Sequence, residues 1–140
     1  MPNNIINTKQ NFMDFTNSQR YRENLILKET FEFAVLIVQY SEVLENERKY
    51  VISKQIIRSG TSIGANVKEA QNAESKADFI HKLKIALKEA DETEYWLFLC
   101  KNLNYHSPDH LIQKLNGIIK LLNKIVTTLK IKRIPNSHIS

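Results

Sequence analysis

Apolar side chains recur at spacings of three and four residues along four long stretches of the chain. That period is expected of α-helices that each bury one face. Only three Gly and three Pro interrupt the 140 residues, which leaves little room for a β fold with many turns. We therefore predict an all-α fold with one four-helix bundle over residues 23–131. A flexible N-terminal leader (1–22) would precede it, and a basic C-terminal tail (132–140) would follow it.

The first two predicted helices differ in how their apolar residues are distributed. Asn24 is a good N-cap for a first helix that ends near Asn46. Apolar residues surround much of this helix, which predicts more than one neighbouring helix. The second helix, from about residue 48 to 72, contains Gly60 and Gly64. An internal glycine costs a helix about 1 kcal/mol relative to alanine, so we expect a close approach to a neighbouring helix there.

The last two helices carry clear start signals. Ser75, with Asp78 three residues later, resembles a capping box that opens the third helix. Ser107-Pro108-Asp109 opens a fourth helix, which we expect to end near Lys130. Short connections favour antiparallel neighbours, so the predicted architecture is an antiparallel, up-down-up-down four-helix bundle. The expected buried rows are Phe79, Leu83, Ala86, Ala90, Thr93, Leu97 and Cys100 in the third helix, and Leu111, Leu115, Ile118, Leu122, Ile125 and Leu129 in the fourth.

A line of polar residues in the second helix has the four-three spacing of a buried seam. It consists of Gln55, Ser59, Ser62, Asn66 and Glu69. We expect this line to be buried against the small residues in the middle of the third helix. Buried polar groups need partners, so the favoured interpretation is a structural network that fixes helix register. A proton-handling or ligand site is the alternative. The predicted network comprises Gln55, Arg58, Ser62, Asn66, Glu69 and Glu92.

Catalytic and metal sites lack the residue spacings that they require. No histidine accompanies the serines of the second helix, and Cys100 lies in an apolar run typical of a buried thiol. Asp78 and His81 form a single Asp-x-x-His pair, whereas a metal site in a bundle needs such pairs on facing helices. We expect a protein that is not an enzyme and has no metal or cofactor. The polar N-terminus and the lack of transmembrane-length apolar segments predict a cytoplasmic protein without membrane contact.

The net charge of +5 comes from the C-terminal quarter of the chain. Residues 1–107 contain fourteen basic and fourteen acidic side chains, whereas residues 108–140 contain six basic side chains and only Asp109 as an acid. The basic residues are Lys114, Lys120, Lys124, Lys130, Lys132 and Arg133. Such a cluster can be an ordinary solvated helix face, or it can bind a phosphate backbone. We favour polyanion binding, without sequence-specific readout, because no recognition motif accompanies the charge.

Three stretches resemble the four-helix-bundle proteins that are encoded in intervening sequences of bacterial 23S rRNA genes. The resemblance covers about residues 24–130. It rests on Phe33-Ala34, on the run from Gln55 to Ala70 (QIIRSGTSIGANVKEA), and on the run from Phe79 to Leu97 (FIHKLKIALKEADETEYWL). Ala70 departs from the family, which commonly has glycine there. This change affects helix packing more than it affects the family resemblance.

The resemblance implies an antiparallel four-helix subunit that assembles into a homopentameric ring without established catalytic activity. The family is also similar to the accessory variability protein of diversity-generating retroelements, a basic pentamer that binds nucleic acid and a reverse transcriptase. Our leading hypothesis is a non-enzymatic homo-oligomer that binds RNA or DNA through its basic C-terminal helix. The alternative is a scaffold that binds a protein partner and no nucleic acid.

Overall fold

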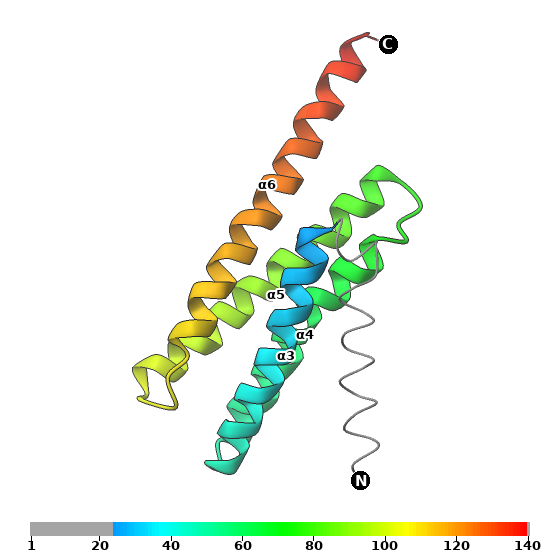
Figure 1. The fold of residues 1–140 in the computed structure, drawn as a ribbon. Coiled ribbons are helices and arrows are strands. Elements are labelled where there is room, and N and C mark those ends of the chain that lie inside the picture. Colours follow the sequence, from blue (N-terminus) through cyan, green and yellow to red (C-terminus); the bar gives the residue numbers. More distant parts are fainter. Residues whose placement is uncertain (1–23, 140) are drawn as a thin grey trace.

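The computed structural model describes the backbone of residues 24–139 and the side chains of residues 24–131. This part of the chain forms four helices and no strand: α3 (Leu25–Asn46), α4 (Tyr50–Ala70), α5 (Lys76–Asn102) and α6 (Asp109–Ile139) (Figure 1). The all-α prediction and the four helices are confirmed. Helix α6 extends nine residues past the predicted end near Lys130. The leader predicted for residues 1–22 lies outside the described residues.

Contacts at both ends of α3 and α4 show that these helices are antiparallel. Asn24, the N-cap of α3, donates from Nδ2 to Oε1 of Gln71, which follows α4 (2.8 Å). At the other end, the hydroxyl of Ser53 early in α4 donates to the carbonyl of Ser41 late in α3 (2.8 Å). Each end of α3 therefore meets the opposite end of α4.

Helix α6 closes the bundle by packing against both α5 and α3. Near the α5–α6 connection, Lys101 pairs with Asp109 (3.0 Å). The hydroxyl of Tyr40, late in α3, donates to the carbonyl of His106, just before α6 begins. In Figure 1 the chain reverses direction at each connection. The contacts and the view agree with an up-down-up-down bundle.

The predicted helix starts are confirmed by the caps. Oδ1 of Asn24 accepts from the N–H of Leu27, and Oγ of Ser75 accepts from the N–H of Asp78. Helices α3 and α5 end in similar turns, each with a non-glycine residue at positive φ: Arg48 at 63° and Asn104 at 58°. In each turn, the N–H of this residue and the N–H of the residue after it donate to carbonyls of the last helical turn, which is the Schellman arrangement.

The close approach predicted at the two glycines is made to α3. A Cβ atom at Gly60 would lie 2.8 Å from the Cγ1 and Cγ2 atoms of Ile37. A Cβ atom at Gly64 would lie 3.1 Å from the carbonyl oxygen of Thr30. Both glycines therefore face α3 and not the small residues in the middle of α5. They let α4 lie close to α3.

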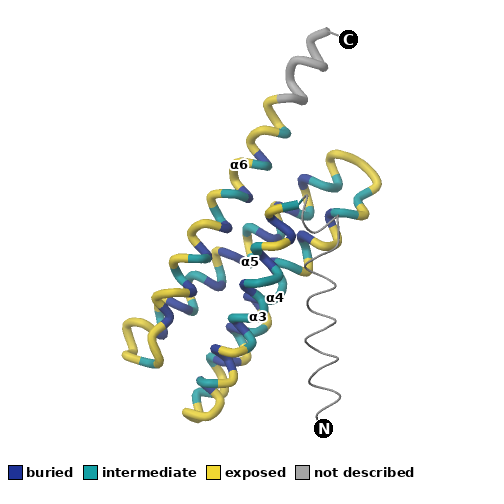
Figure 2. Tube along the Cα trace, in the orientation of Figure 1, coloured by how far each residue is buried: buried dark blue, intermediate teal, exposed yellow. Residues whose placement is uncertain are grey.

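The rows predicted for α5 and α6 are largely confirmed as the core (Figure 2). In α5, Ile80 is buried and Phe79 is only partly buried. In α6, Val126 is buried, whereas Ile125 and Leu129 are only partly buried. No helix among the described residues is long and apolar enough to cross a membrane.

Candidate nucleic-acid interface

The polar line of α4 lies at the edge of the bundle core. Among its members Ser59 is buried, but Gln55, Ser62 and Asn66 are only partly buried, and the side chain of Glu69 is 62% exposed. The prediction of a buried polar seam is therefore wrong. An apolar row beside it fills the core, comprising Ile56, Ile63, Val67 and Ala70. Burying that row removes apolar surface from water without the cost of desolvating charges.

Three of the predicted network residues share one set of contacts. The guanidinium of Arg58 donates to Oε1 of Gln55 and to Oε2 of Glu92. Glu92 also accepts from the indole N–H of Trp96 (3.0 Å). Arg58 lies 3.6 Å from Oε2 of Glu89, an atom that is buried and accepts no hydrogen bond from the described residues. This cluster connects α4 to α5 through charged groups at the rim of their interface.

The other three predicted network residues make separate contacts. The hydroxyl of Ser62 donates to the carbonyl of Arg58, and the amide of Asn66 donates to the carbonyl of Ser62, both within α4. Glu69 pairs with Lys82 of α5 (3.3 Å). Sequence spacing placed these residues on one helical face, but it did not indicate which of them reach α5.

Lys114 faces the protein and pairs with two carboxylates of α3. Its Nζ lies 2.8 Å from Oε2 of Glu29 and 3.5 Å from Oε2 of Glu32, and its side chain is 19% exposed. Burial alone would lower the pKa of Lys114, but the two carboxylates outweigh it and raise that pKa above the usual lysine value. Most of the charge of Lys114 is therefore compensated within the chain.

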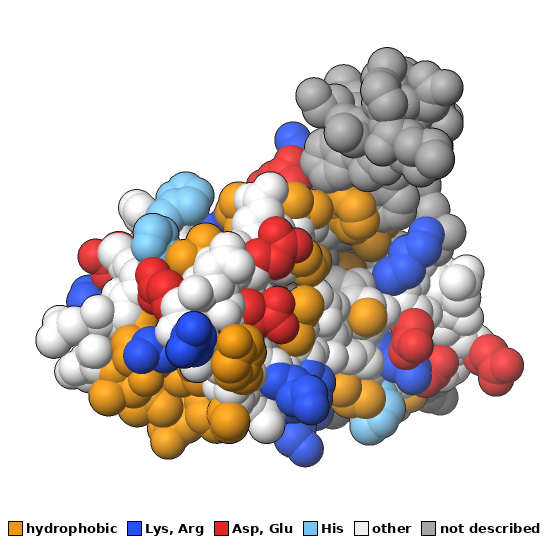
Figure 3. All heavy atoms as spheres, turned by 90° about the horizontal axis from the view of Figure 1, so that it is seen from below, with side chains coloured by type: hydrophobic (Ala, Val, Ile, Leu, Met, Phe, Trp, Pro, Cys, Tyr) orange, Lys and Arg blue, Asp and Glu red, His pale blue; other side chains and the backbone are white. Residues whose placement is uncertain are grey.

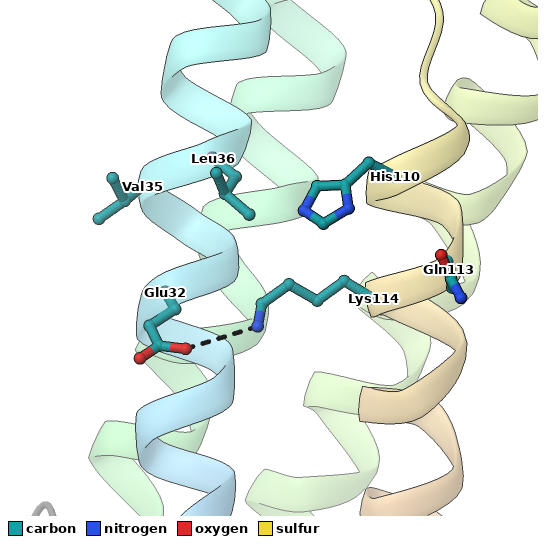
Figure 4. Close-up of a pocket in the computed structure, with 6 residues that line it drawn as sticks. All are labelled: Glu32, Val35, Leu36, His110, Gln113 and Lys114. Atoms are coloured by element: carbon teal, nitrogen blue, oxygen red, sulfur yellow. Dashed lines mark hydrogen bonds and ion pairs between the residues drawn. The ribbon is translucent and has the colours of Figure 1, made fainter.

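An open hollow of about 500 Å³ surrounds this ion pair, between α3 and α6. Figure 4 shows Lys114 extending from α6 toward Glu32, with His110 one turn away and pointing toward Leu36. No group of three or more His, Cys, Asp or Glu side chains that could hold a metal occurs among the described residues. The hollow therefore contains an internal ion pair and one exposed imidazole.

Lys120, Lys124 and Lys130 are exposed on α6, unlike Lys114. At 100° per residue, Lys120 and Lys124 lie opposite the buried row of Leu115, Ile118 and Leu122. After Asp109 the helix contains no acidic residue, so its outer face has lysines among neutral polar side chains. The side chains of Lys132 and Arg133 lie outside the described residues.

The basic residues predicted from the sequence did not include Lys84 of α5. The positive charge of Lys84 lowers the pKa of Lys130 below the usual lysine value. Charge counting missed Lys84 because the acidic and basic residues before Ser107 balance. The antiparallel order of α5 and α6 was the signal that could have located it, since that order brings the start of α5 to the late turns of α6.

The single cysteine is part of the core. Cys100 is fully buried, and burial raises the pKa of its thiol. Burial likewise raises the pKa of the Tyr40 hydroxyl, which contacts the thiol. A thiol held neutral in apolar surroundings is a packing group and a poor nucleophile. The predicted buried position of Cys100 is confirmed.

Comparisons with known proteins agree with the fold. The 23S rRNA-intervening sequence protein family matches residues 22–126. A crystal structure of a protein with unknown function from the S23 ribosomal protein family, from Bacteroides thetaiotaomicron VPI-5482, superposes with a TM-score of 0.70 at 50% identity. The match covers 72% of this chain and 97% of that chain. No curated protein matches. Since the family match spans well over half of the sequence, the chain belongs to the family of 23S rRNA-intervening sequence proteins.

Proposed function

We propose that the protein is a non-catalytic, cytoplasmic homo-oligomer that binds RNA or another nucleic acid through the outer face of α6. The observation that supports this proposal is the arrangement of Lys120 and Lys124. Both are exposed opposite the buried row of their helix, and no acidic residue follows Asp109 in the sequence to neutralise them. An unbalanced basic face of this kind attracts a phosphate backbone without reading its sequence.

The pair of Lys84 and Lys130 strengthens this proposal. The positive charge of Lys84 repels that of Lys130 and lowers its pKa. A phosphate between them would replace that repulsion with two attractions. The basic residues predicted from the sequence also include Lys132 and Arg133, whose side chains lie outside the described residues. Lys114 was among the binding residues predicted from the sequence. It is not part of the proposed interface, because Glu29 and Glu32 pair with it.

The family supplies the reason to test RNA first. Its name refers to the 23S rRNA, and the solved relative is named after a ribosomal protein family. Neither name states a binding activity. They favour RNA over DNA as the first ligand, and the lysine face supports either polyanion.

We place the oligomer contact on the α3–α4 face. Two hollows lie along it: one of about 530 Å³ that includes Val38, Val51 and Ile57, and one of about 240 Å³ that includes Phe31 and Ala65. Val51 is 80% exposed and Tyr50 60% exposed. Side chains of this type stabilise contacts between subunits when they are covered. We propose five subunits because the family resemblance implies a pentamer.

A protein-interaction scaffold is the second candidate, and the same α3–α4 face favours it. Viewed from the end of the bundle with the α3–α4 and α5–α6 connections, hydrophobic side chains gather in patches between charged ones (Figure 3). A different protein could cover the α3–α4 face instead of a second copy. Light scattering of the wild type and of Val51→Glu separates the two: a homo-oligomer loses mass in the variant, whereas a scaffold is monomeric in both.

Nucleic-acid binding is tested by reversing single charges. Fluorescence anisotropy with labelled RNA, repeated over a series of salt concentrations, gives the slope of log affinity against log salt. Lys120→Glu and Lys124→Glu should each weaken binding and reduce that slope by about one, since each removes about one phosphate contact.

Lys76→Glu is the matched control, because Lys76 is an exposed lysine in the first turn of α5. Lys76→Glu makes the same change in net charge as Lys120→Glu, so a general charge effect would weaken RNA binding equally in both variants. The proposal fails if the wild type does not bind RNA at low salt, or if Lys76→Glu is as harmful as Lys120→Glu.

A further inference from the structure

Helix α5 has a solvent-facing stripe whose composition changes along its length. The stripe consists of Lys84, Lys88, Asp91, Tyr95 and Phe98, at spacings of four, three, four and three residues. All five residues are exposed, and the buried row of α5 lies on another face of the helix. Basic side chains occupy the early part of this stripe, and aromatic rings occupy the later part.

Two aromatic rings on this stripe are exposed to solvent. Tyr95 is 61% exposed and Phe98 43% exposed, although large apolar side chains are the usual material of a core. The ring of Trp96 supports Tyr95 in an edge-to-face contact, with centroids 5.1 Å apart. Trp96 is itself held by its hydrogen bond to Glu92. Tyr95 is thus an exposed ring in contact with a hydrogen-bonded indole.

The α5 stripe lies beside the basic face of α6. The Lys101–Asp109 ion pair joins the two helices near their connection, and Lys84 meets Lys130 farther along. Between these two contacts the helices run side by side, so the aromatic part of α5 is flanked by the turns of α6 before and around Lys120. Lys88 and Tyr95 are seven residues apart, which is about 10 Å along the helix.

We infer that Tyr95 and Phe98 stack against unpaired bases while the adjacent lysines hold the phosphates, so that the protein prefers single-stranded nucleic acid to a duplex. This inference rests on the proposed nucleic-acid binding and names its ligand class. A duplex conceals the faces of its bases, whereas a single strand offers them to exposed rings beside a basic track. The lysines alone would bind both forms.

The test compares two strands that carry the same number of phosphates. One is a labelled single-stranded DNA oligonucleotide without secondary structure, and the other is an abasic strand of equal length. Tyr95→Ala should bind the intact strand about tenfold more weakly than the wild type does, in line with the loss of one stacked base. Its affinity for the abasic strand should not change. Phe98→Ala should show the same pattern, and Tyr95→Phe should keep most of the affinity.

Leu103→Ala is the matched control, because Leu103 is 48% exposed but follows α5, outside the stripe and outside the two hollows of the α3–α4 face. It should not alter the affinity for either strand. The fluorescence of Trp96, the only tryptophan, gives a second readout: the intact strand should quench it and the abasic strand should not.

The results separate this inference from the proposed function. Lys120→Glu could weaken binding of both strands while Tyr95→Ala and Phe98→Ala weaken neither. In that case the proposed binding through the lysines of α6 is supported and the inference of base stacking is wrong. If Tyr95→Ala lowers the mass measured by light scattering, the stripe is a contact between subunits and the inference is overturned. If the wild type binds neither strand but binds the labelled RNA, this inference fails and the proposed function stands; if it binds no RNA either, both fail.

Discussion

Helix α3 meets its two neighbours by different means. The backbones of α3 and α4 lie close together, because Gly60 and Gly64 have no side chain at the positions where they contact Ile37 and Thr30. Against α6 the contact includes the long side chain of Lys114, which reaches Glu29 and Glu32 beside an open hollow.

The difference shows how the fold separates packing from surface chemistry. Small residues fix the spacing of α3 and α4 closely, because a single added methyl group would collide with a neighbour. A long paired side chain tolerates small displacements, since it can change rotamer. Helix α6 is therefore the element whose outer face can carry charge without disturbing the core.

The largest expected effect comes from filling the closest contact. Gly60→Ala should destabilise the protein by about 1–3 kcal/mol, because the new Cβ would overlap Ile37 and the gain in helix propensity of about 1 kcal/mol offsets only part of that cost. Urea denaturation followed by circular dichroism measures the change.

Gly117→Ala in α6 is the matched control for this substitution. A Cβ atom there meets nothing within 4 Å, so only helix propensity changes and the protein should become more stable by up to about 1 kcal/mol. Equal effects of the two substitutions would show that the α3–α4 contact is no tighter than the surface of α6.

A smaller effect is expected from Lys114→Ala, which leaves two partly buried carboxylates without their cation. We expect a loss of about 1–2 kcal/mol, below the cost of breaking a fully buried pair because solvent screens these groups. Lys120→Ala should change stability by less than about 0.5 kcal/mol. For nucleic-acid affinity we expect the reverse: Lys120→Ala should weaken binding more than Lys114→Ala does. A larger loss of affinity in Lys114→Ala would contradict the division of α6 into a face that pairs with α3 and an outer face that binds nucleic acid.

The same ion pair predicts a pH dependence. Because pairing raises the pKa of Lys114, its stabilising effect is fully present below the ordinary lysine pKa of about 10.4 and is lost as pH rises through the higher folded value. The stability difference between wild type and Lys114→Ala should stay constant at neutral pH and shrink only in strong alkali. Denaturation curves at several pH values measure it, and a difference that shrinks near pH 7 would exclude this assignment.

The smallest effect on stability is expected at the Lys84–Lys130 contact. Lys84→Ala removes the neighbouring positive charge, so the pKa of Lys130 should rise toward the usual lysine value while the fold is unchanged. Titration of the Lys130 side chain by NMR measures the shift. An unchanged pKa would mean that the two ammonium groups do not approach each other in solution.

Much of the helix pattern could be read from the sequence, because it depends on local rules. The N-caps at Asn24 and Ser75 and the start of α6 near Pro108 follow from residues that bond within one turn. The polar line of α4 shows the limit of the same rules. Period alone places Glu69 in a seam, but an apolar row on a neighbouring stripe is better suited to burial, and Glu69 pairs with Lys82 at the surface.

The sequence by itself determined four helices, their approximate ends, the family resemblance and the excess charge of the last helix, since each depends on residue type and spacing. Only the tertiary structure decided that the glycines face α3, that Lys114 is neutralised by two glutamates, and that Lys84 adjoins Lys130. The reason is physical: helical period fixes which residues share a face, whereas the partner of each face depends on how whole helices pack. The charge that counting assigned to one helix is therefore divided in space between an internal ion pair and an exposed basic face.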